Sequence, residues 1–79
     1  MLIDDLVMEW RVFRHKAQYG ERTMEDMTDR ERAGMYLSIH EGNALDNYRE
    51  TERALGRRGR EETCVLLREA LREQAKEEG

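Results

Sequence analysis

The sequence predicts an all-α fold, a small three-helix up-down-up arrangement with a long central helix. Three observations predict it. The 79 residues contain no proline, where average usage would give roughly four, so the commonest helix stop is missing. Glycine marks two breaks, at Gly20 and at 56–59. In the three stretches between the breaks, apolar residues recur at steps of three and four. We therefore expect a single helical domain over 1–79.

The first helix is expected over 3–19. One apolar stripe on it would face a neighbouring helix and consists of Ile3, Leu6, Trp10, Phe13 and Ala17. Gly20 follows where a helix end requires a positive φ. Further apolar residues lie outside the stripe, namely Leu2, Val7, Met8 and Val12. This helix is therefore either wrapped by both other helices or carries an interface.

The second helix is expected over 29–55, after a polar connection in which Thr23 could start a short turn. Thr28 and Glu31 have the spacing of a capping box. The apolar stripe keeps its phase through Gly42, which favours one long helix, straight or bent at Gly42, over two short ones. The stripe consists of Ala33, Leu37, His40, Ala44, Tyr48, Thr51 and Leu55. Gly34 and Gly42 each cost about 1 kcal/mol relative to alanine, so they permit close packing or mark a weak point.

The third helix is expected over 60–76, with Cys64, Leu67, Leu71 and Ala75 as its packing seam. Two charged stripes flank this seam. The basic stripe is Arg68, Arg72 and Lys76, and the acidic stripe is Glu62, Glu69, Glu73 and Glu77. They form either an ordinary solvated face or a face that selects a partner helix.

Catalytic, cofactor and metal sites are not expected. His40-Glu41 opens the signature of zinc proteases, but Ala44 stands where that motif needs a second histidine. Ser38 and Cys64 lie in no nucleophile motif. The sequence therefore predicts a protein that is not an enzyme.

The lone cysteine suits a reducing compartment, and no apolar stretch approaches the roughly 20 residues of a membrane span. We expect a cytoplasmic protein without a membrane partner.

Charge argues against direct nucleic-acid binding. Four arginines gather before the third helix, where an anion could bind: Arg53, Arg57, Arg58 and Arg60. However, 21–56 contains nine acidic and five basic residues, and the net charge of the chain is −4. A duplex would be repelled by this surface.

The sequence instead predicts a protein-binding module, an adaptor or inhibitor that docks on a larger macromolecule. Carboxylates along a helix can occupy a basic groove that normally holds phosphates. In being short, acidic and poor in cysteine, the chain is similar in composition, though in no motif, to phage-encoded anti-defence and anti-CRISPR factors. The alternative is a self-assembling helical protein, a homodimer or higher oligomer, because only 38% of residues are apolar and 41% are charged. The candidate contact residues are Trp10, Tyr19, Tyr36, Arg57 and Arg58.

Overall fold

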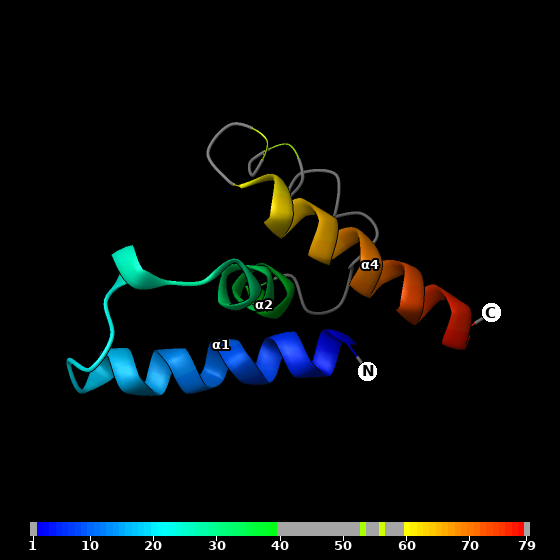
Figure 1. Cartoon of the computed structure of the whole chain (residues 1–79). Coiled ribbons are helices and arrows are strands. Elements are labelled where there is room, and N and C mark those ends of the chain that lie inside the picture. Colours follow the sequence, from blue (N-terminus) through cyan, green and yellow to red (C-terminus); the bar gives the residue numbers. More distant parts are fainter. Residues whose placement is uncertain (1, 40–52, 54–55, 57–59, 79) are drawn as a thin grey trace.

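The computed structural model describes residues 2–39, 53, 56 and 60–78, and within them the protein is all-α (Figure 1). Three helices account for most of these residues: α1 (Leu2–Gln18), α2 (Asp29–Ile39) and α4 (Glu61–Glu78). A short 3-10 helix, η1 (Met24–Asp26), lies in the connection between α1 and α2. No strand occurs in the described ranges. The predicted fold class is therefore confirmed.

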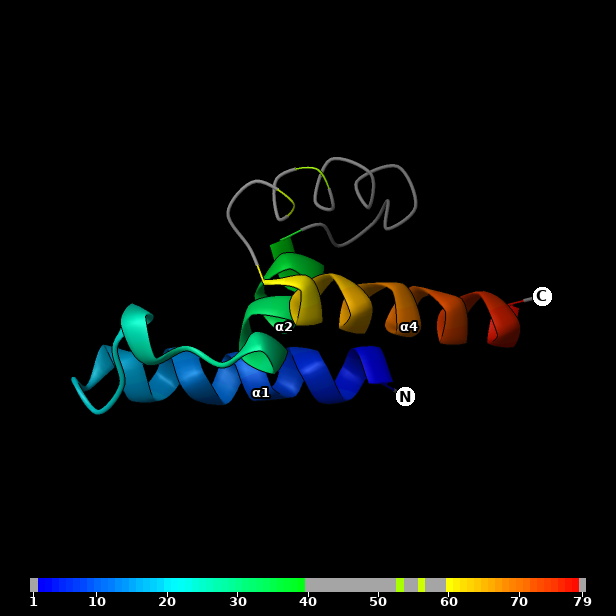
Figure 2. The same cartoon turned by 45° about the horizontal axis from the view of Figure 1, so that its top comes forward.

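Helix α2 crosses the other two helices rather than running alongside them. In Figure 1, α1 lies across the view while α2 is seen nearly end on. Figure 2 shows α4 on the same side of α1 as α2, running in roughly the opposite chain direction to α1. The predicted up-down-up arrangement is not confirmed. Residues 40–52 of the predicted central helix, including Gly42, lie outside the described part of the chain.

The connection after α1 follows the local rules that the sequence predicts. Gly20 has a φ of 77°, and its N–H donates to the Ala17 carbonyl at 3.1 Å. The next N–H, that of Glu21, donates to the Lys16 carbonyl at 3.0 Å. This pair of bonds is a Schellman motif, which satisfies carbonyls that the helix end leaves free.

Both predicted turn signals before α2 are confirmed. Thr23 precedes η1, and its N–H donates to the Asp26 carboxylate at 3.0 Å. At the start of α2, the Thr28 N–H donates to Glu31 Oε1 at 2.9 Å. The Glu31 N–H donates in return to Thr28 Oγ1 at 3.1 Å. These two bonds form the capping box, which fixes the first turn of α2.

The core is small and lies where the three helices meet. Leu6 of α1, Ala33 of α2, and Leu67 and Ala70 of α4 form one cluster of side chains that are at most 2% exposed. Six half-buried residues pack around it, namely Leu2, Ile3, Tyr36, Leu37, Cys64 and Leu66. The cluster has one contribution from α1, one from α2 and two from α4, so α1 packs against both other helices.

Gly34 sets the contact between α1 and α2. A Cβ atom added there would collide with the carbonyl group of Leu6 and would lie 3.0 Å from the Cβ of Trp10. The backbones of the two helices therefore approach more closely than any side chain at this position would permit. Of the two roles that the sequence left open for this glycine, close packing is the one that the structure shows.

The seam predicted for the third helix is partly wrong. Leu67 and Leu71 are buried, but Ala75 is exposed, and Thr63 and Ala70 are fully buried instead. The buried stripe is rotated toward Thr63, whose hydroxyl has a partner on α2. Thr63 Oγ1 donates to Asp29 Oδ1 at 3.2 Å, which makes burial of a hydroxyl acceptable.

Candidate protein-binding surface

The side of α1 that faces away from the core is unusually apolar. Three large apolar residues on it or directly after it are exposed, Met8 by 57%, Val12 by 47% and Tyr19 by 69%. Met8 and Val12 are four residues apart and share one side of the helix, opposite buried Leu6 and Phe13. Tyr19 follows in the turn directly after the helix. We call Met8, Val12, His15 and Tyr19 the outer face of α1. Only part of the apolar excess that the sequence places on this helix is covered by its two neighbours.

The outer face is bordered by charges of opposite sign at its two ends. Residues 2–9 of α1 contain three acidic and no basic side chains, and residues 10–18 contain three basic and no acidic ones. Asp4, Asp5, Arg11 and Lys16 are all exposed. None of these four forms an ion pair with another residue that the structure describes. Their charges are therefore available to a partner.

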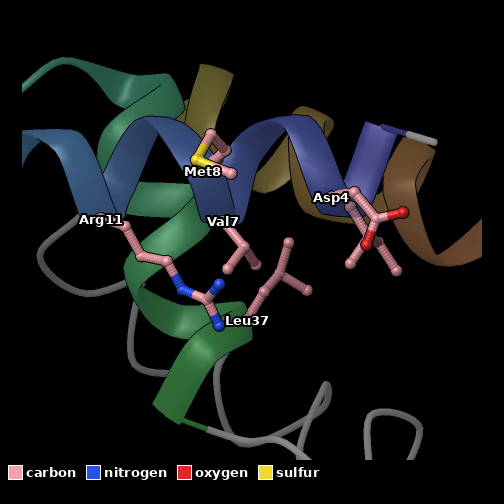
Figure 3. A pocket seen from close by; sticks show the side chains of 6 residues that line it. Asp4, Val7, Met8, Arg11 and Leu37 are labelled. Carbon is pink, nitrogen blue, oxygen red and sulfur yellow. The ribbon is translucent and has the colours of Figure 1, made fainter.

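A shallow groove of about 230 Å³ lies beside the outer face, between α1 and α2 (Figure 3). Its lining is mainly apolar, with Ile3, Val7 and Met8 from α1 and Leu37 from α2. Asp4 and Arg11 lie at opposite ends of it, as Figure 3 shows. The groove extends the apolar surface of Met8 toward α2 and repeats the arrangement of an acid at one end and a base at the other.

The predicted aromatic contact residues fall into two groups. Tyr19 is on the outer face, where its ring meets the His15 ring edge-on with centroids 5.0 Å apart. Trp10 is half-buried and stacks on Phe13, with centroids 5.9 Å apart. Tyr36 is half-buried and packs against the central cluster. The structure thus leaves Tyr19 as the most accessible of the three and gives Trp10 and Tyr36 intramolecular contacts.

The predicted arginine contacts, Arg57 and Arg58, lie outside the described residues. Their neighbour Arg60 is described, and its side chain is 72% exposed, with Nη1 3.7 Å from Asp29 Oδ2. A broad, open depression lies against Arg60, Glu61, Glu62 and Val65 at the start of α4. This region presents Val65, 41% exposed, among charged side chains.

Arg22 organises a polar clasp that the sequence analysis missed. Its Nη1 and Nη2 donate to the two carboxylate oxygens of Glu31 at 3.0 and 2.9 Å. Its Nε donates to Asp26 at 2.5 Å, and its guanidinium lies 4.8 Å from the centroid of the Phe13 ring. The clasp therefore ties the connection and the start of α2 to α1. The spacing of Arg22 and Asp26, four residues apart, was the available signal.

The clasp shifts the pKa values of its members. Burial raises the pKa of Glu31, but hydrogen bonds from Arg22 and Thr28 outweigh it and leave the pKa lowered. The N–H of Thr23, followed by Arg22, lowers the pKa of Asp26. Hydrogen bonds to Glu31 and then Asp26 raise the pKa of Arg22. All three groups are held in their charged forms, as bidentate pairing favours.

These pairings reduce the acidic surface expected of 21–56. Glu31 is used in the clasp, and Asp29 lies among Thr63, Arg32 and Arg60. Glu21 and Glu25 remain exposed. The acidic side chains offered to a partner by the described part of this segment are thus fewer than the sequence suggests.

No group of three or more His, Cys, Asp or Glu side chains within the described ranges is arranged to hold a metal ion. In the same ranges, no helix has the length and apolar character needed to cross a bilayer. Comparisons of the chain with family models, with curated proteins and with solved structures found no match. Among the described residues, the outer face of α1 and the charges around it are the features that suggest a function.

Proposed function

We propose that the protein is a non-enzymatic protein-binding module that acts in the cytoplasm as an adaptor or inhibitor of a larger macromolecule. The observation that supports this proposal is the outer face of α1. Met8 and Val12 expose large apolar side chains on one side of α1, and Tyr19 exposes its ring in the turn that follows. Methionine and aromatic residues are enriched in protein interfaces, and a helix whose apolar side lies in a partner's groove is a recurring mode of recognition.

The inhibitor form of this function would place the protein on a basic surface of nucleic-acid-handling machinery, in the manner of an anti-CRISPR factor. Its support is the net charge of −4 and the exposed carboxylates of Asp4, Asp5, Glu21 and Glu25. Charge of this kind speeds association with a basic partner and selects against other partners. In this form the protein binds the machinery and not the nucleic acid.

Capture experiments with surface variants test the proposal. The doubly substituted chain, Met8→Ser with Val12→Ser, should lose captured partner at least tenfold relative to wild type, because two exposed apolar contacts are removed. Val65→Ser is the matched control, since Val65 is also an exposed apolar residue but lies on α4. Circular dichroism should show unchanged helix content in all three chains.

Retention of the partner by the Met8 and Val12 variant would overturn the proposal that α1 is the contact surface. Equal loss in the Val65→Ser chain would do so as well, because it would place the contact on α4.

Self-assembly is the second candidate function. It is favoured by a specific observation, the opposite charges of the two halves of α1, which suit a copy of the same helix.

A further inference from the structure

We infer that the outer face of α1 binds α1 of a second copy of this chain, with the two helices antiparallel. The inference rests on the proposed protein-binding role of this face and names an occupant for it. It concerns a dimer contact on the same face, so a second copy and a larger macromolecule would compete for it.

The spacing of residues along α1 supports the antiparallel arrangement. Asp4, Met8, Val12 and Lys16 follow one another at intervals of four, and all four are exposed. We call them the α1 row. Rows with this interval are the ridges that most often interdigitate when two helices pack. The α1 row reads acid, apolar, apolar, base.

A two-fold axis midway along the α1 row makes it complementary to itself. Met8 then lies opposite Val12 of the second copy, and Asp4 lies opposite Lys16 of the second copy. Two-fold symmetry repeats each of these contacts, so one interface contains two apolar pairs and two ion pairs. A parallel arrangement would place like charges together at both ends.

Charges outside the α1 row agree with this arrangement. Asp5 adds to the acidic half of α1, and Arg11 and Arg14 add to the basic half. Glu9 also belongs to the acidic half, but its carboxylate is paired with Arg30 of α2. The helix dipole accounts for acids in the first turn and bases in the last turn. It does not account for Arg11 in the middle of the helix, because the effect of the dipole fades within one turn of the end.

The expected dimer is concentration-dependent. Because α1 has 17 residues, it is about 25 Å long. A single helix of that length covers less than the roughly 800 Å² per partner of a standard interface. The ion pairs are exposed and therefore screened by salt. The dimer should dissociate on dilution and at high ionic strength.

Light scattering over a hundredfold dilution series of the full chain tests the inference. The measured mass of the wild-type protein should rise from one chain toward two with concentration. An acid-reversed variant, Asp4→Lys with Asp5→Lys, and a base-reversed variant, Arg11→Glu with Lys16→Glu, should each remain at one chain. Reversal of either half places like charges opposite one another.

An equimolar mixture of the two variants provides the positive control. Each variant should be monomeric alone, and the mixture should recover a species of two chains. In the mixture, α1 of the acid-reversed chain carries bases in both halves and meets α1 of the base-reversed chain, which carries acids in both halves. Circular dichroism on each variant verifies that the helices remain folded. A single-chain mass for the wild type at every concentration would overturn the inference. A dimer that persists in both variants, or a mixture that stays monomeric, would also overturn it.

The outcome is separable from that of the capture experiment. A wild-type chain that stays monomeric but loses its partner on substitution of Met8 and Val12 would refute the dimer and retain the protein-binding role of the face. A chain that dimerises as expected but captures its partner through α4 would retain the dimer and refute the binding of a larger macromolecule by this face.

Discussion

The contacts of α2 with α1 and with α4 depend on different kinds of interaction. Its contact with α1 includes a close approach of backbones, at Gly34 and the Leu6 carbonyl, beside the exposed ion pair between Arg30 and Glu9. Its contact with α4 includes a polar link, between Asp29 and the buried hydroxyl of Thr63. The close approach at Gly34 depends on the absence of a side chain, whereas the link at Thr63 depends on the presence of a hydroxyl group. A small core can thus hold its helices both by close approach of backbones and by a buried hydrogen bond between side chains.

The largest expected effect is at the first contact. Gly34→Ala should destabilise the protein by about 2–3 kcal/mol, because a methyl group in this position would force α1 and α2 apart. Alanine is the better helix former, so helix propensity alone would predict a gain of about 1 kcal/mol. Urea denaturation followed by circular dichroism measures the difference. A stabilised Gly34→Ala chain would show that the helices separate without cost.

A smaller effect is expected at the second contact. Thr63→Val keeps the shape of the side chain but removes the hydroxyl that donates to Asp29, and it should cost about 1 kcal/mol. Thr63→Ser retains the donor and serves as the matched control, although it loses a buried methyl group. A valine variant as stable as the wild type would show that the hydroxyl of Thr63 contributes nothing to the contact.

The smallest effect on stability is expected from acid. Acid should weaken the clasp of Arg22, which contains carboxylates, and should leave the approach of the backbones at Gly34 unchanged. The pKa values of Glu31 and Asp26 are lowered in the folded state, so the stability they contribute is complete above their unfolded pKa values. It should be lost as pH falls below about 4 and the two carboxyl groups take up protons.

Thermal unfolding between pH 7 and pH 3 should therefore show a decline that is shallower in an Arg22→Gln chain, which lacks the cation of the clasp. Equal slopes in the two chains would show that other carboxylates cause the acid sensitivity.

Local features were predictable from the sequence because local residues determine them. The capping box of Thr28 and Glu31 and the positive φ of Gly20 each follow from a few neighbouring residues. The apolar spacing that includes Leu6 and Phe13 likewise predicts the buried side of α1 without knowledge of the helices that cover it.

Features that join separate segments were not predictable in the same way. The seam of α4 is rotated toward Thr63, which meets Asp29, a partner 34 positions away in sequence. The clasp of Arg22 depends on Glu31, whose capping role alone was recognised. For the candidate surface, the surplus of Met8 and Val12 was visible in the sequence. Its exposure depends on how much of α1 the other two helices cover.

The contact between Gly34 and the Leu6 carbonyl also determines how α1 and α2 can be placed relative to each other. The α2 backbone meets the Leu6 carbonyl at Gly34, so moving α2 until any of its other residues took this place would bring a side chain onto that carbonyl. Gly34 therefore fixes the point at which the two helices cross. Rotation about that point is opposed by the ion pair between Arg30 and Glu9 and by the clasp of Arg22. Position and angle are thus controlled by different residues.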